Sequence, residues 1–230
     1  MPKKLHLAIW LILIAVFSCE DTEIQNNIRV LVTGNVIDQN AQPIANANVK
    51  VYADADAFGA DRVLLGEGVS NASGSFNITS LFGPNQLFLV DISSGAQYST
   101  YRYQTNTEEF TPGDLTFNLQ TVALNAMTNF TYNIIRESGE SNTLYYRFTY
   151  FDANCTEVYE EGILNESLSN CDNTRVIGST LDDASPNAEN ISFVVPLQSQ
   201  VEFSYRFNED DEISEFITVN SADYAFQFSY

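Results

Sequence analysis

The segment "IRVLVTGNVIDQNAQPIANANVKVYADAD", residues 28–56, decides the expected fold. Residues 28–37 and 47–52 are rich in β-branched side chains, and in the second stretch valine alternates with polar residues. A period of two is the pattern of a strand with one buried face. Asp, Gln, Asn and Pro dominate residues 38–43, which is typical of a turn. The segment therefore predicts two strands joined by a turn.

The same alternation continues to the end of the chain. "LYYRFTYF" (144–151), "VEFSYRF" (201–207) and "YAFQFSY" (224–230) each place alternate aromatic residues on one face. Because no stretch has a helical period, we expect an all-β fold of two consecutive antiparallel β-sandwich domains, residues 28–123 and 124–230. Further strands are expected after Arg62 and at residues 75–79, 86–93, 98–104, 115–124, 130–135, 191–197 and 213–219.

Four short motifs follow one another in the first half. They are GNVID (34–38), PI (43–44), ANVKV (47–51) and GSF (74–76). In this order they resemble the carboxypeptidase regulatory-like domain, which is a prealbumin-like β-sandwich. The resemblance covers residues 28–123 and implies a non-catalytic module, of the kind that occurs in outer-membrane receptors and lipoproteins of the Bacteroidota.

The chain begins like an exported protein. Two lysines occur among the first four residues, the next thirteen are apolar apart from one histidine, and residues 16–19 are VFSC. This apolar stretch is shorter than the roughly 20 residues of a membrane-spanning helix. VFSC resembles the lipobox of bacterial lipoproteins, which implies a signal peptide over residues 1–18 and a lipid anchor on Cys19. An ordinary secretory signal is the alternative.

An acidic linker, residues 19–27, separates this cysteine from the first strand. Glu20, Asp21 and Glu23 resemble the export signal of Bacteroidota surface lipoproteins. The resemblance implies an outer-membrane protein that faces the cell exterior. A plain solvated linker on a protein that faces the periplasm is the alternative.

Charge and composition argue against several classes of function. The chain has 30 acidic and 10 basic residues and a net charge of −20, so it repels nucleic acids and anionic lipid headgroups. The one histidine, His6, lies in the expected signal peptide. Cleavage there would leave no imidazole for Ser-His-Asp or Cys-His catalysis or for histidine-ligated metals. We therefore expect a protein that is not an enzyme and has no cofactor; acid–base catalysis by a pair of Asp or Glu side chains in a cleft is the alternative.

Cys155 and Cys171 remain once Cys19 is lipidated. An even number of cysteines in an exported chain predicts a disulfide, which would stabilise the fold by about 3 kcal/mol. Two buried free thiols are the alternative.

Two candidate sites stand out. Asp54, Asp56 and Asp61 in "DADADAFGAD" are candidate ligands of a structural calcium ion, although the segment lacks a complete calcium-loop motif and an acidic solvated loop is the alternative. Tyr98, Tyr101 and Tyr103 could present rings to a ligand or partner, with core packing as the alternative.

These features predict a non-enzymatic outer-membrane lipoprotein, an accessory or scaffold subunit of an outer-membrane protein complex. The alternative is an extracellular glycan- or peptide-binding lipoprotein that serves a nutrient-uptake system. This alternative requires an exposed aromatic surface, which a scaffold does not need.

Overall fold

The computed structural model describes residues 24–54 and 62–230, and these residues form strands and turns without a helix. Among them, accordingly, no helix is long and apolar enough to span a membrane. The strands are β1 (Gln25–Asp38), β2 (Asn48–Asp54), β3 (Arg62–Val69), β4 (Ser75–Phe82), β5 (Leu87–Ser93), β6 (Tyr101–Asn106), β7 (Thr116–Leu124), β8 (Met127–Ile135), β9 (Leu144–Asp152), β10 (Cys155–Glu160), β11 (Ile163–Leu164), β12 (Asn173–Leu181), β13 (Ala188–Pro196), β14 (Gln200–Phe207), β15 (Ile213–Thr218) and β16 (Tyr224–Ser229). The all-β prediction is confirmed.

Two sheets enclose the first hydrophobic core. Their strand orders are β4-β1-β7 and β11-β10-β6-β5-β2-β3. Val49 and Val51 of β2 are fully buried while Asn48 and Lys50 are exposed, as the alternation predicts. Across the two sheets, Phe88 and Phe117 stack with their ring centroids 4.3 Å apart. The core is therefore a β-sandwich interior filled from both sides.

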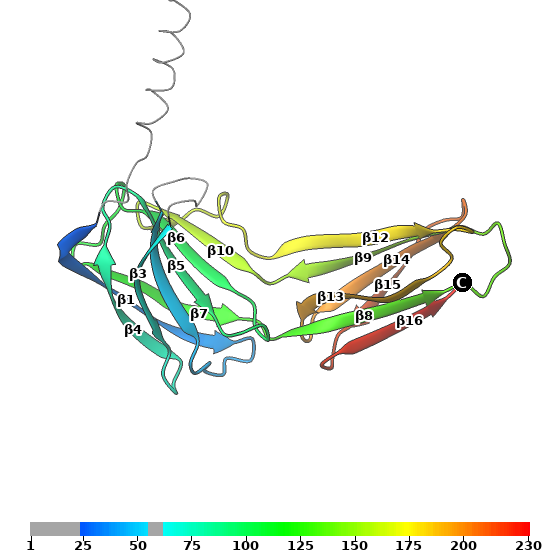
Figure 1. Ribbon diagram of the computed structural model, residues 1–230, viewed down its shortest axis with the longest axis horizontal. Helices are drawn as coiled ribbons and strands as arrows, with labels where there is room; N and C mark the ends of the chain where they lie inside the picture. Colours follow the sequence, from blue (N-terminus) through cyan, green and yellow to red (C-terminus); the bar gives the residue numbers. More distant parts are fainter. Residues whose placement is uncertain (1–23, 55–61) are drawn as a thin grey trace, which may run out of the picture.

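The second core lies between the sheets β12-β9-β14-β15 and β13-β8-β16. It is built mainly from aromatic rings on alternate residues of each strand. Phe148 of β9 is fully buried, and its ring centroid lies 4.6–6.1 Å from those of six other rings. The two cores lie end to end, which gives the molecule an elongated shape (Figure 1).

The expectation of purely antiparallel sheets is wrong for three strand pairs. β1 and β7, β6 and β10, and β8 and β16 pair in parallel. These partners are distant in sequence, so no hairpin turn fixes their relative direction. Alternation within a strand predicts which face is buried but not which way a distant neighbour runs.

One segment of the second half belongs to the sheet of the first core. β10 pairs with β6, from Cys155 opposite Tyr101 to Tyr159 opposite Thr105 (Figure 1). β11 extends the same sheet. The predicted boundary at residues 123/124 therefore does not separate the hydrogen-bonded sheets. The local pattern could not reveal this pairing, because the choice of partner strand is made by long-range packing.

Candidate functional site

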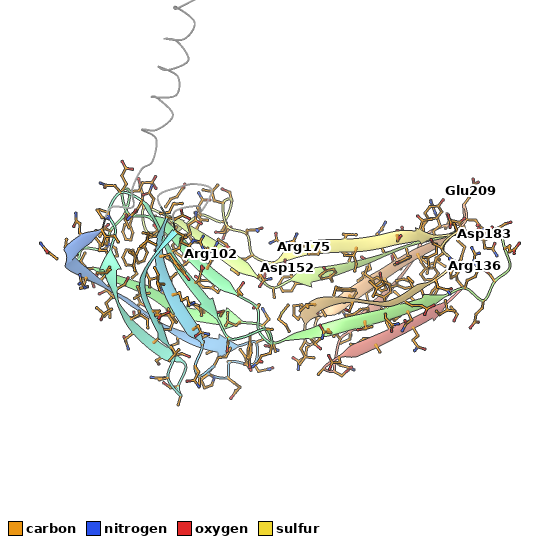
Figure 2. The ribbon with its side chains drawn as sticks, viewed as in Figure 1. Arg102, Arg136, Asp152, Arg175, Asp183 and Glu209 are labelled. Atoms are coloured by element: carbon orange, nitrogen blue, oxygen red, sulfur yellow. A yellow bond between two sulfur atoms is a disulfide. The ribbon has the colours of Figure 1, made fainter. Side chains whose placement is uncertain are left out.

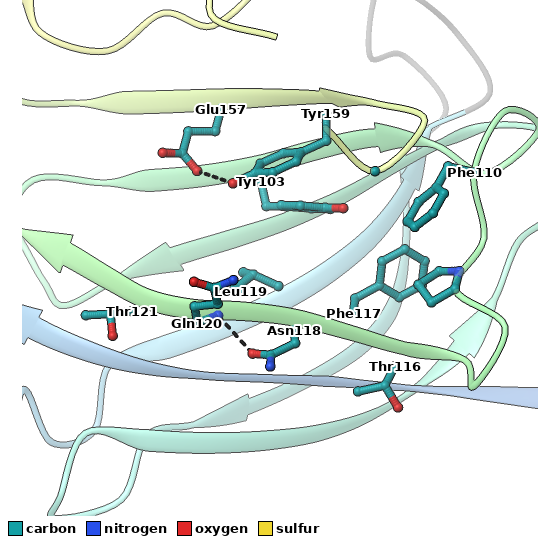
Figure 3. Close-up of a pocket in the computed structure, with 12 residues that line it drawn as sticks. Tyr103, Phe110, Thr116, Phe117, Asn118, Leu119, Gln120, Thr121, Glu157 and Tyr159 are labelled. Atoms are coloured by element: carbon teal, nitrogen blue, oxygen red, sulfur yellow. Dashed lines mark hydrogen bonds between the residues drawn. The ribbon is translucent and has the colours of Figure 1, made fainter. Parts of the chain in front are cut away.

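A groove lies between β7 and β10, where one sheet of the first core extends past the other. β7 is the edge of its three-stranded sheet, whereas the facing six-stranded sheet continues through β10 and β11. In the part of the chain that the structure describes, the three-stranded sheet consequently has no further strand beyond β7 to cover the inner face of β10. The space that remains has a volume of about 400 Å³ (Figure 3). It is lined by Tyr103, Phe110, Pro112, Thr116, Phe117, Asn118, Leu119, Gln120, Thr121, Glu157, Tyr159 and Gly162.

A carboxylate faces this groove from the core side of its sheet. Glu157 alternates with Cys155 and Tyr159 along β10, and these three residues share a face with Tyr101 and Tyr103 of β6. The Tyr101 hydroxyl donates to Oε2 of Glu157 at 2.5 Å, and the Tyr159 hydroxyl donates to the same oxygen at 2.9 Å (Figure 3 shows the second bond). The sheet thus holds one carboxylate between two phenols.

Burial changes the acidity of these phenols. It raises the pKa of Tyr103 to about 12. Burial, followed by the hydrogen bond to Glu157, raises the pKa of Tyr159 to about 12 and that of Tyr101 further. All three hydroxyls therefore stay protonated at neutral pH, and those of Tyr101 and Tyr159 act as donors toward the carboxylate.

The three tyrosines predicted to contact a ligand or partner do not form an exposed surface. Tyr101 and Tyr103 are each 7% exposed, and Tyr98 is half-buried where it bridges to Ala126. The Tyr103 ring lies 4.7 Å from that of Tyr159 and 6.4 Å from that of Phe117. The sequence pattern did not decide whether the rings of Tyr101 and Tyr103 face solvent or the core. They are covered because β10 pairs with β6 beside them. Only Tyr103 of the three lines the groove.

Local backbone features shape both ends of the groove. At one end Gly162 has a φ of +79°, and a Cβ on it would lie 2.7 Å from the Phe110 ring. Along β7, the register with β1 shifts after Asn118, whose Oδ1 accepts a 2.9 Å hydrogen bond from the backbone N–H of Gln120. This bulge turns two consecutive side chains, Gln120 and Thr121, outward.

The predicted disulfide between Cys155 and Cys171 is present. It closes a loop of 16-residue separation that contains β10 and β11. The backbone N–H of Cys155 also donates to the carbonyl of Thr100 at 3.0 Å. The disulfide therefore fixes the strand that carries Glu157.

The calcium candidates are not brought together by the described part of the chain. Asp54 is 5% exposed and its Oδ2 lies 3.7 Å from Nε of Arg62, so its charge has a partner. Asp56 and Asp61 lie outside the described residues. Within residues 24–54 and 62–230, no group of three or more His, Cys, Asp or Glu side chains is arranged to hold a metal ion. Calcium remains a prediction.

The N-terminal candidates also lie outside the described residues. These are the lipidation site Cys19 and the acidic residues Glu20, Asp21 and Glu23. The anchor and the export signal therefore remain predictions.

A second hollow, of about 380 Å³, lies at the junction of the two cores. Its charges are neutralised in pairs, with Arg102 donating to Asp91 at 2.6 and 2.8 Å and Arg175 donating to Asp152 at 3.0 Å. Figure 2 shows Arg175 and Asp152 close together at this junction. Because Arg102 and Arg175 are already paired with carboxylates, we interpret this hollow as part of the packing between the two cores and not as a binding site.

Sequence reasoning missed Glu157, Tyr159 and Phe110 as site residues. In "CTEVYEE" the face that turns inward contains a cysteine, a glutamate and a tyrosine, so it lacks an apolar pattern. The disulfide prediction was the one available signal that this segment is fixed in place.

Comparisons with known proteins do not place the chain in a family. No family model matches, and no curated protein matches. Among solved structures, the chain is similar to the shaft pilin SpaA of Lactobacillus rhamnosus GG at 10% identity, over 87% of this chain and 96% of the pilin, with a TM-score of 0.34. A streptococcal ancillary pilin is 11% identical over 89% of this chain and 63% of its own, with a TM-score of 0.33.

A 9R-lipoxygenase from Cyanothece PCC8801 is 17% identical over 46% of this chain, with a TM-score of 0.30. This chain spans 18% of the length of that enzyme. Similarity at these TM-scores indicates neither a family nor a function.

Proposed function

We propose that this protein is a non-enzymatic outer-membrane lipoprotein, attached through Cys19 and displayed on the cell surface, that serves as an accessory or scaffold subunit of an outer-membrane protein complex. In this proposal its two β-sandwiches are two domains that act as one body, the first of them a prealbumin-like module. The motifs of the first half, the lipobox-like VFSC and the acidic residues after it support the assignment.

The observation that supports a scaffold best is the number of chain connections between the two cores. The chain passes from the first core to the second between β7 and β8, returns between β9 and β10, and leaves again between β11 and β12. Separate domains joined by one linker move relative to one another by default. Three connections restrict that motion, because each fixes a further point of the junction.

Polar contacts add to this junction. Asn154 Oδ1 accepts hydrogen bonds of 2.9 Å from both the backbone N–H and the hydroxyl of Thr100. Gln39 Oε1 accepts one of 2.8 Å from the backbone N–H of Ala126. A scaffold requires such a junction, since its contact surfaces have to stay at a fixed spacing.

Affinity purification of the lipidated protein tests the proposal. Tagged protein is extracted from membranes in mild detergent beside a Cys19→Ala variant, which lacks the anchor. We expect an outer-membrane protein to co-purify with the wild type in a constant ratio and to be lost with the variant. Recovery of the wild-type lipoprotein alone would contradict an accessory role.

Protease treatment of intact cells tests the location separately. A surface-displayed lipoprotein should be degraded while a periplasmic marker protein survives. If the lipoprotein survives as well, and is cleaved only after the outer membrane is opened, it faces the periplasm.

A glycan- or peptide-binding lipoprotein that serves nutrient uptake is the second candidate. The groove between β7 and β10 favours it, because a concave site with rings and a few polar groups is the usual form of a ligand site. Burial of Tyr101 and Tyr103 removes the exposed platform on which that candidate first rested. Binding of oligosaccharides by the purified protein, without any co-purifying membrane protein, would favour it over a scaffold.

A further inference from the structure

We propose that the groove between β7 and β10 binds an arginine or lysine side chain on an extended segment of a partner protein. This inference rests on the proposed accessory function, since it names the chemistry by which a partner would be held. Its elements are one carboxylate, a wall of aromatic rings and a free strand edge.

The carboxylate of Glu157 has room for an external cation. Both phenol donors meet Oε2, and within residues 24–54 and 62–230 no donor contacts Oε1. Among the described residues that line the groove there is no lysine or arginine. A carboxylate that is partly removed from water without a counter-charge is costly, and a guanidinium or ammonium group would supply both the charge and the hydrogen bonds.

Aromatic rings lie beside this carboxylate. Tyr103 and Tyr159 lie on the same side of the groove as Glu157, and Phe110 closes the end near Gly162 (Figure 3). A cation over a ring face is attracted by the ring quadrupole, and the methylene stem of arginine or lysine packs well on such rings. The rings therefore suit both parts of a basic side chain.

The opposite wall offers backbone groups to an extended segment. In the described part of the chain, β7 pairs with β1 alone, so its outer edge has no partner strand, and among residues 116–118 the one N–H there that a side chain already binds is that of Thr116, which donates to Asp114 Oδ1 at 3.0 Å. An added strand can pair with such an edge. The bulge after Asn118 interrupts the regular strand, and pairing with β1 resumes only at Thr121, so the available regular length on this side of the bulge is the short stretch from Thr116 to Asn118.

Charge favours a basic partner over the alternatives. The net charge of −20 attracts cationic segments and repels acidic ones. A neutral sugar could stack on the rings but would leave Glu157 without a counter-charge. Taken together, the groove selects for a positively charged side chain on a strand-like peptide.

Peptide binding to the full-length lipidated protein in detergent tests the inference. The probes are labelled Thr-Val-Arg-Val-Thr and a matched peptide with citrulline in place of arginine, which keeps the shape and removes the charge. We expect the arginine peptide to bind about tenfold more tightly or better, because a charge-assisted hydrogen bond is lost in the other. Equal binding of the two peptides would overturn the proposal without any variant.

Two variants with the same change of net charge locate the binding. Glu157→Gln keeps an acceptor for Tyr101 and Tyr159, and Glu166→Gln alters an exposed acid of the same disulfide loop outside the groove. We expect the first to abolish the preference for arginine and the second to preserve it. If both variants weaken binding of the arginine peptide equally, the peptide is held by general electrostatic attraction. That result would overturn the proposed site at Glu157. Thermal unfolding of both variants checks that they are folded.

The same variants separate this inference from the accessory function. If Glu157→Gln recovers the membrane partner as well as the wild type does, the groove is not the contact, while the accessory function stands. If the arginine peptide binds selectively but no partner is ever recovered, the site stands and the accessory function fails. Selective binding of oligosaccharides in place of both peptides would overturn the inference.

Discussion

The hydroxyl of Tyr101 donates a 2.5 Å hydrogen bond to Oε2 of Glu157, which lies 56 residues further along the chain. This bond joins β6 to β10 on the side that faces the first core. It links a strand of the first half to a segment that the chain reaches only after building two strands of the second core. β10 therefore takes part both in the groove and in the junction of the two cores.

Removal of the Tyr101 hydroxyl tests this link. We expect Tyr101→Phe to lower the free energy of unfolding by about 1–2 kcal/mol, because the hydrogen bond goes to a carboxylate and Tyr101 is buried. Urea unfolding measures the change. Tyr145→Phe, at an exposed ring, is the matched control and should have almost no effect. Equal stability of Tyr101→Phe and wild type would show that the bond contributes nothing.

Alkaline pH should destabilise the protein through Tyr103. Its pKa is raised from the ordinary 10.0 to about 12 by burial, so the folded state favours the neutral phenol. This stability is fully present below pH 10, falls by up to about 1.4 kcal/mol per pH unit above it, and is lost as pH passes the folded pKa.

Urea unfolding between neutral pH and pH 12 measures this loss. Tyr103→Phe removes the titrating group, so its stability should decline less steeply than that of the wild type. Parallel curves for the two proteins would contradict a raised pKa at Tyr103.

Reduction of the disulfide should loosen β10 and β11. A bond that closes a loop of 16-residue separation stabilises by about 3 kcal/mol in the chain-entropy model. We expect the double variant Cys155→Ser, Cys171→Ser to lose about that amount in urea unfolding. Hydrogen exchange should increase most at β10, and much less in β8 and β9. Protection of β10 equal to that of the wild type would show that pairing with β6 is sufficient without the disulfide.

Two glycines provide a matched test of the groove's closed end. Gly162→Ala places a side chain at a φ of +79° and against the Phe110 ring, so we expect a loss of about 1–2 kcal/mol. A Cβ on Gly139 would meet nothing within 4 Å, so Gly139→Ala should change stability by less than about 0.5 kcal/mol. Thermal unfolding compares the two. A similar loss in both would show that neither φ nor the Phe110 contact matters at Gly162.

The sequence by itself determined the local features of this protein. Alternation identified most of the strands and their buried faces, from Val49 and Val51 in β2 to Phe148 in β9, because a strand turns successive side chains to opposite sides. It did not predict β10, β11 or β12, whose residues do not alternate between buried and exposed. The cysteine count identified the Cys155–Cys171 disulfide. Both signals are readable within short segments or from simple counts.

Only the tertiary structure decided which strands are neighbours. The parallel pairs, the return of β10 to β6, and the groove with Glu157 on its inner face all join residues far apart in sequence. The rings of Tyr101 and Tyr103, open to either solvent or core by pattern alone, became buried because β10 pairs beside them. A period of two specifies a face, whereas the partner strand is selected by packing and hydrogen bonding across the whole fold.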